Sequence, residues 1–142
     1  MKKKVLFICL HNSVRSQMAE GILRKLYGNI YEAYSAGTEP SEVSPYTIKV
    51  MNEIGIDISR HYSKSVNEFI RIDFDYVVTV CDDAKEICPL FSAGKRHIHK
   101  GFENPIYFKG MEDEILEKFR EVRDEIKEWI IKEFGKLRNN TK

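Results

Sequence analysis

The segment from residue 9 to residue 16, CLHNSVRS, contains a cysteine, an arginine and hydroxyl-bearing side chains within one short stretch. Arg15 follows Cys9 by six positions, so a curled loop can bring the sulfur and the guanidinium to the same anion. A guanidinium group matches two oxygens of a tetrahedral oxyanion, and its charge favours the nucleophilic thiolate form of a nearby cysteine. Ser16 can donate its hydroxyl hydrogen to that thiolate. The predicted chemistry is therefore attack of the Cys9 thiolate on a bound oxyanion.

The backbone of this loop is a candidate anion-binding element. A loop that curls before a helix can direct successive N–H groups into one concavity, and the helix N-terminus adds its dipole. The N–H groups expected to bind the oxyanion, beside the Arg15 side chain, are those of Leu10, His11, Asn12, Ser13 and Val14. Asn12 is a residue type that tolerates the left-handed conformation such a curl requires. The alternative is that Cys9 is an ordinary buried cysteine and Arg15 a surface residue.

Two elements must position the loop. Residues 5–8 form a continuous apolar run, which is typical of a buried parallel strand. From Ser16 onward the apolar residues follow a helical period that ends at Gly28, a frequent helix terminator. Cys9 is therefore expected at the carboxyl end of a strand, with the helix starting a few residues later.

The rest of the chain continues the alternation of strands and helices. Strands are predicted over residues 31–36, 76–80 and 96–99, and helices over residues 45–54 and 111–134. This order predicts a single α/β domain over residues 1–142, with a four-stranded parallel sheet and helices on both faces. In such sheets ligands bind at the carboxyl ends of the strands. Cys81 directly follows the strand at 76–80, so it is expected at the same edge as Cys9.

Composition narrows the classes of partner. Lysine and arginine number 23 and aspartate and glutamate 22, so the net charge of +1 favours neither nucleic acid nor a membrane surface. No apolar run is long enough to span a bilayer, and the apolar stretch near the start is too short for a signal peptide. We therefore expect a cytoplasmic protein, in which the three cysteines are reduced at rest.

The segment CLHNSVRSQMAEG at residues 9–21 resembles the signature of the low-molecular-weight tyrosine phosphatase family. Its second half, SQMAEG, is most similar to the thioredoxin-coupled arsenate reductases of that family. The similarity extends over nearly the whole chain, through YSAG at 34–37, VVTVC at 77–81, CP at 88–89 and REVRDEI at 120–126. The resemblance implies a flavodoxin-like, four-stranded parallel sheet, with Cys9 as the nucleophile and Arg15 as the anion ligand.

The resemblance also implies a role for all three cysteines. Cys9 would attack arsenate, Cys81 would attack the Cys9 sulfur and release arsenite, and Cys88 would then form a disulfide with Cys81. Sulfur exchange of this kind needs direct contact between the thiols. The expected function is a cofactor-free arsenate reductase of arsenic resistance, with a redox-active disulfide that thioredoxin reduces.

Two other interpretations remain open at this point. A low-molecular-weight protein tyrosine phosphatase, or another phosphomonoesterase, would need only Cys9 and Arg15. Cys81 and Cys88 would then be small buried apolar residues. The other interpretation is a redox-sensing or anion-binding module without turnover.

One position departs from the family pattern. Where the phosphatases and many of the reductases have an aspartate before a proline as the proton donor, this chain has Asn104, in the segment FENP. An amide cannot act as a general acid. Either the neighbouring Glu103 takes that role, or the proton comes from substrate or solvent, which is easier for arsenate than for an alkoxide leaving group. The change weakens the phosphatase interpretation more.

A second departure concerns a cation. Asn12, Glu20 and Ser35 match positions that surround a monovalent cation in some of the reductases, and Lys64 stands where an acidic ligand would complete that site. The ammonium group of Lys64 can replace the cation, or Lys64 can be an ordinary surface lysine. The cysteine spacing does not fit a zinc site, and no metal is expected. The histidines are expected to be structural, with His11 in the loop as the best candidate for an exception.

Overall fold

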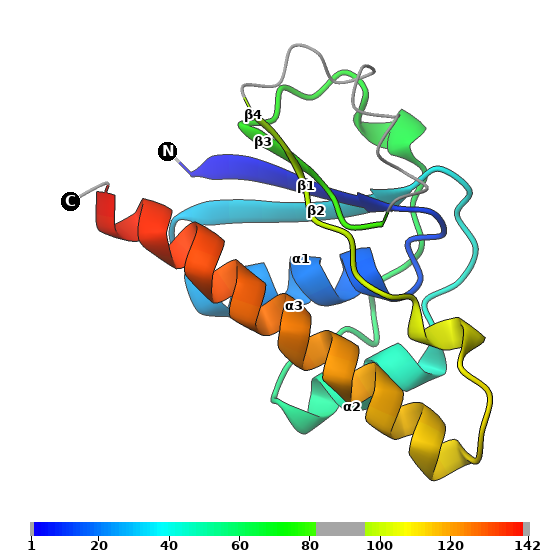
Figure 1. Ribbon diagram of the computed structural model, residues 1–142. Coiled ribbons are helices and arrows are strands. Elements are labelled where there is room, and N and C mark those ends of the chain that lie inside the picture. The colour runs from blue at the N-terminus through cyan, green and yellow to red at the C-terminus, as the bar shows by residue number, and fades with distance from the viewer. Residues whose placement is uncertain (1, 82–95, 141–142) are drawn as a thin grey trace.

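The computed structural model describes residues 2–81 and 96–140, with residues 136–140 described as backbone only. Its elements follow one another as shown in Figure 1. They are β1 (Lys3–Cys9), α1 (Arg15–Tyr27), β2 (Tyr31–Gly37), α2 (Pro45–Glu53), the 3-10 helix η1 (Val66–Phe69), β3 (Tyr76–Thr79), β4 (Arg96–His99), the 3-10 helix η3 (Pro105–Tyr107) and α3 (Glu112–Asn140). None of the helices in the described part of the chain is long and apolar enough to cross a membrane.

The four strands form one parallel sheet in the order β2-β1-β3-β4, which confirms the predicted sheet. Strand β1 is central because residues 5–8 are fully buried, as the continuous apolar run predicted. The chain runs from β1 outward to β2 and then crosses back to β3 on the other side of β1. This reversal creates a crevice at the carboxyl ends of β1 and β3, the place where parallel sheets bind ligands.

The two faces of the sheet are covered differently. Helices α1, α2 and α3 lie together on one face (Figure 1), where the ring of Phe134 in α3 meets the edge of Phe7 in β1 at 6.1 Å between centroids. On the opposite face Tyr34 of β2 packs against Phe69 of η1 and against Phe74. Within the described residues, that second face therefore carries a 3-10 helix and irregular chain. The α-helical layer is on the side of α1.

The predicted elements agree with the observed ones to within a few residues, apart from the last helix, which continues beyond residue 134 to Asn140.

The fold requires a glycine at the end of β2. A Cβ atom added to Gly37 would lie 2.8 Å from backbone atoms of Leu10, His11 and Asn12. Since real Cβ contacts are longer than this, only glycine lets β2 end directly against the loop that follows β1.

Candidate active site

The loop between β1 and α1 turns its carbonyl groups away from the crevice. Backbone N–H groups of the segment after β2 donate to these carbonyls, from Thr38 to Cys9 (3.3 Å), from Glu39 to Leu10 (2.8 Å) and from Ser44 to Ser13 (3.1 Å). Because these carbonyl groups are bonded to the segment after β2, the N–H groups are the backbone groups of the loop that are expected to face an anion. This is the arrangement of an anion-binding nest.

Helix α1 begins at the loop without a capping side chain. Val14 occupies the N-cap position and makes no side-chain cap, and the first turn contains no acidic residue. The first N–H groups of a helix have no partner within the helix, and they carry the positive end of its dipole. The start of α1 therefore favours a negatively charged ligand.

Asn12 holds the curl of the loop. Its φ angle is 53°, which confirms the predicted left-handed conformation. The side-chain oxygen accepts hydrogen bonds from the backbone N–H of Lys64 (2.9 Å) and from Nε2 of Gln17 (3.0 Å). The amide nitrogen in turn donates to Oγ of Ser16 at 2.7 Å. Since the backbone N–H of Lys64 can only donate, the orientation of the Asn12 amide is determined.

This orientation decides what Ser16 does for Cys9. The Ser16 oxygen already accepts from Asn12, so its own hydrogen can point to the Cys9 sulfur, which lies 2.8 Å away. Both residues are buried. A hydrogen bond donated to sulfur stabilises the charged form of the thiol. The Ser16 hydroxyl is therefore placed to donate a hydrogen bond to the Cys9 sulfur.

Arg15 is held in place but keeps donors free for a ligand. Its side chain is 7% exposed, and Nη1 donates to the carbonyl oxygen of Phe102 at 3.1 Å. The buried Nε has no hydrogen-bond partner among the described residues. A buried donor without a partner costs free energy, which an oxyanion bound by the fork would recover.

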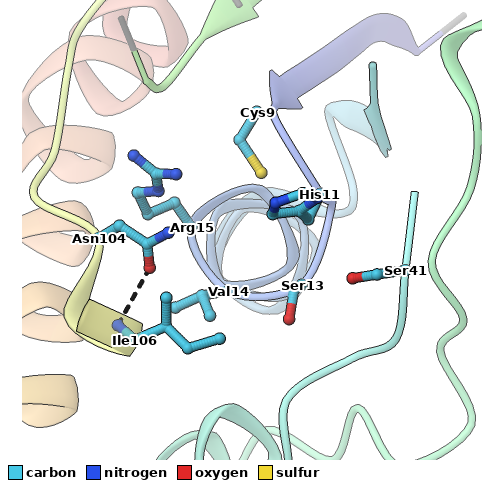
Figure 2. Close-up of a pocket in the computed structure, with 8 residues that line it drawn as sticks. All are labelled: Cys9, His11, Ser13, Val14, Arg15, Ser41, Asn104 and Ile106. Atoms are coloured by element: carbon cyan, nitrogen blue, oxygen red, sulfur yellow. Dashed lines mark hydrogen bonds between the residues drawn. The ribbon is translucent and has the colours of Figure 1, made fainter. Parts of the chain in front are cut away.

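These groups meet in one small cavity (Figure 2). Its lining consists of Cys9, His11, Ser13, Val14, Arg15, Ser41, Asn104 and Ile106. The cavity is small, with a volume of about 30 Å³. Nδ1 of His11 lies 2.8 Å from the carbonyl oxygen of Glu39, which can only accept, so Nδ1 carries the hydrogen in this loop.

The four residues of the expected cation position lie together behind the loop. Glu20 is buried; it accepts a hydrogen bond from Ser35 at 2.5 Å, and Nζ of Lys64 is 3.7 Å from the same carboxylate oxygen. Arg24 contacts the other carboxylate oxygen at 2.6 Å. Lys64 is 9% exposed, and burial lowers the pKa of its ammonium group. Lys64 is thus a buried partner of Glu20 rather than a surface lysine.

The two candidates for proton donation are placed differently. Asn104 lines the cavity of Cys9, whereas Glu103 points to another cavity beside Trp129. The Glu103 carboxylate lies 2.6 Å from Nζ of Lys118, and its side chain is 62% exposed. The position of Glu103 gives no support to a role in proton transfer at Cys9.

Cys81 is close to the loop in the fold. The backbone N–H of Val80 donates to the carbonyl of Ile8 at 2.9 Å, so the chain continues from β3 alongside the end of β1. Cys81 is buried, with 1% exposure. The two cysteines therefore follow the carboxyl ends of neighbouring strands, whereas Cys88 lies outside the described residues.

The sequence did not single out Gln17 or His61. Gln17 is fully buried and donates to Asn12, and its side-chain oxygen lies 2.9 Å from Nδ1 of His61. Nε2 of His61 faces Arg24, which can only donate, so the hydrogen of neutral His61 is on Nδ1 and points to Gln17. Burial lowers the pKa of His61, which favours this neutral form. A glutamine in the first turn of the helix that follows the loop was the available signal.

Comparison with known proteins agrees with this geometry. Residues 4–142 match the family described as low molecular weight phosphotyrosine protein phosphatase. An arsenate reductase of Halalkalibacterium halodurans is 43% identical over 125 residues, which is 88% of this chain and 90% of the relative. Arsenate reductase 1 of Staphylococcus epidermidis is 44% identical over 89% of this chain and 91% of its own length.

Solved structures give the same relationship. An arsenate reductase in its phosphate binding state has a TM-score of 0.82 and 35% identity, covering 94% of this chain and 98% of that one. A low molecular weight protein tyrosine phosphatase from T. tengcongensis has a TM-score of 0.78 and 30% identity, covering 95% and 99%. From the family match and the extent of these similarities, the chain belongs to the low molecular weight phosphotyrosine protein phosphatase family.

Proposed function

We propose that this protein reduces arsenate to arsenite, with its cysteines as the source of electrons. The observation that carries the proposal is the position of Cys81 after β3, beside the strand that ends in Cys9. Hydrolysis of a phosphate ester needs one thiol, whereas a two-electron reduction needs a second. The names of the relatives support the same reaction.

In the first proposed step the Cys9 thiolate attacks arsenic in hydrogen arsenate. A sulfur–arsenic bond forms, the bond from arsenic to its hydroxyl oxygen breaks, and one proton from solvent converts the departing hydroxyl to water. No electrons leave the protein in this step. Arg15 and the N–H groups of residues 10–14 hold the remaining oxygens, and the Ser16 hydroxyl donates a hydrogen bond to the sulfur.

The second step is the reduction. The Cys81 thiolate attacks the Cys9 sulfur, a disulfide forms between them, and the sulfur–arsenic bond breaks with its electron pair on arsenic, which leaves as arsenite. The Cys88 thiolate then attacks Cys81 and frees Cys9 as a thiolate. The resulting disulfide between Cys81 and Cys88 is the proposed substrate of thioredoxin. The cycle requires reduced thiols, which suits the cytoplasm.

The test is a coupled assay that measures arsenite formation with thioredoxin, thioredoxin reductase and NADPH. Wild-type protein should turn over many times, and Cys81→Ser should form no arsenite. Cys88→Ser should release one equivalent and stop with a disulfide between Cys9 and Cys81, which mass spectrometry of the intact linkage detects. Full multiple-turnover reduction by Cys81→Ser would exclude the relay.

A phosphatase is the second candidate, and it is favoured by the similarity to the tyrosine phosphatase structure together with the Cys9 and Arg15 geometry. Hydrolysis of p-nitrophenyl phosphate should be measured in parallel. Cys81→Ser should retain whatever hydrolysis the wild type has, because water rather than a thiol cleaves a phosphorylated Cys9.

A further inference from the structure

The segment from Phe102 to Ile106 closes one side of the Cys9 cavity. Arg15 is tied to it by the hydrogen bond from Nη1 to the carbonyl oxygen of Phe102. The side chains of Asn104 and Ile106 then line the cavity opposite Cys9 (Figure 2). The position of this segment is therefore linked to that of the guanidinium that binds the anion.

The orientation of the Asn104 amide follows from its neighbour. The backbone N–H of Ile106 donates to the Asn104 side chain at 3.1 Å, which caps η3. Because a backbone N–H can only donate, the atom that faces Ile106 must be Oδ1. Figure 2 shows the oxygen of Asn104 toward Ile106 and the nitrogen on the side of Arg15.

Among the described residues, those that line the cavity include no carboxylate. Glu103, the neighbour of Asn104 in the sequence, is bound to Lys118 and lines another cavity. An amide nitrogen donates its hydrogens at every pH and releases no proton. Asn104 can therefore add a hydrogen bond to a bound oxyanion, but it cannot protonate a leaving group.

We propose that Asn104 donates a hydrogen bond to the bound oxyanion and makes the cavity selective for free inorganic oxyanions over their organic esters. The inference rests on the proposed function and names the substrate class of the same site. When Cys9 attacks an ester, the bond from phosphorus to the organic oxygen breaks and leaves an alkoxide or aryloxide that needs a proton. When Cys9 attacks a protonated inorganic oxyanion, the departing oxygen already carries a hydrogen.

Asn104→Asp is the sharpest variant, because its carboxylate can still accept from Ile106 and keep the cap of η3. It replaces the donor with a charged acceptor. Binding of inorganic phosphate, measured by calorimetry at pH 7.5 where the carboxyl is charged, should weaken by more than tenfold. Hydrolysis of phenyl phosphate, whose phenoxide leaving group needs a proton, should rise by about tenfold or more at about pH 5, where the carboxyl can carry a proton. The new hydrolysis should fall as rising pH deprotonates the introduced carboxyl.

Asn104→Ala removes both the donor and the cap, and it should weaken phosphate binding by about tenfold without raising hydrolysis. Glu103→Gln is the matched control at the next position, and it should leave phosphate binding and hydrolysis unchanged. Circular dichroism of each variant checks that it is folded.

The proposal is overturned if Asn104→Asp binds phosphate as tightly as wild type, since the cap alone would then explain the effect of alanine. It is also overturned if Glu103→Gln abolishes hydrolysis, or if Asn104→Asp hydrolyses the ester no faster than wild type. These measurements use phosphate and an ester only. Failure of the wild type to form arsenite would contradict the proposed function and leave the phosphate results for Asn104 to stand.

Discussion

The first half of helix α1 connects two polar regions that treat charge in opposite ways. In the Cys9 cavity the guanidinium of Arg15 bonds to a backbone carbonyl, and the lining residues that the structure describes include no carboxylate. In the cluster behind the loop Glu20 is contacted by Lys64, Arg24 and Ser35. The Cys9 cavity therefore has a positive charge suited to an anion. The Glu20 cluster has a carboxylate whose charge is neutralised by its neighbours.

The comparison explains how the buried Arg15 keeps hydrogen-bond donors for a ligand. A neutralised cluster can be held firmly by its own contacts, whereas a cavity with an unpaired donor such as Nε of Arg15 is less stable until its ligand binds. Asn12 joins the two regions, because it bonds to the backbone of Lys64 on one side and to Ser16 on the other. Through Asn12, the Glu20 cluster thus helps to hold the loop that forms the Cys9 cavity.

The largest effect is expected from changes inside the cavity. Cys9→Ser should lower both arsenate reduction and ester hydrolysis by at least about 1,000-fold, because a serine hydroxyl stays protonated near neutral pH. Arg15→Lys should lose about 100-fold, because a point charge cannot reproduce the two-pronged hydrogen bond. Steady-state rates with both substrates measure these losses. Near-normal turnover of Arg15→Lys would mean that the anion binds elsewhere.

Removal of the carboxylate from the other region should act on stability. Glu20→Gln leaves the buried ammonium of Lys64 without its counter-charge, and we expect a loss of about 3 kcal/mol in the free energy of unfolding by urea. The double variant Glu20→Gln with Lys64→Met should recover part of the lost stability, because the buried ammonium group is then removed as well. A loss below about 0.5 kcal/mol in the single variant would show that the cluster is not held by Glu20.

A smaller effect is expected from the protonation of His61. Burial lowers the pKa of His61 in the folded protein below the value of about 6.5 for an unfolded chain. The unfolded chain therefore binds the proton more readily, so stability is highest above pH 6.5 and falls as the pH drops through the unfolded and then the folded pKa. His61→Asn, which keeps a donor for Gln17, should flatten this part of the profile of melting temperature against pH. If the slope of melting temperature against pH is unchanged, groups other than His61 cause this pH dependence.

The smallest effect concerns monovalent cations. Since the ammonium of Lys64 lies next to Glu20, we expect it to take the place of a bound cation. Exchange of potassium for sodium at constant ionic strength should then change the rate of arsenate reduction by less than about twofold. Lys64→Met should create a dependence on potassium. Strong activation of the wild type by potassium would show that a separate cation site exists.

Much of the fold follows from local patterns in the sequence. The apolar run at residues 5–8 and the helical period after Ser16 identified β1 and α1, because side-chain periodicity depends on near neighbours. The left-handed residue Asn12 and the contact between Ser16 and Cys9 were predictable for the same reason, since they lie within one loop. Local sequence patterns were therefore enough to predict Cys9 as the nucleophile and the loop that holds it.

Tertiary structure decided which distant residues complete the site. Asn104 and Ser41 reach the cavity from segments far along the chain, and Glu103 is turned toward Lys118 although it is the neighbour of Asn104. The burial of Lys64 against Glu20 was equally undecided, because a lysine in a loop is compatible with either solvent or core. These contacts depend on how the chain crosses from β2 to β3 and returns past β4. Sequence periodicity is set by neighbours three or four positions away, so it carries no information about such crossings.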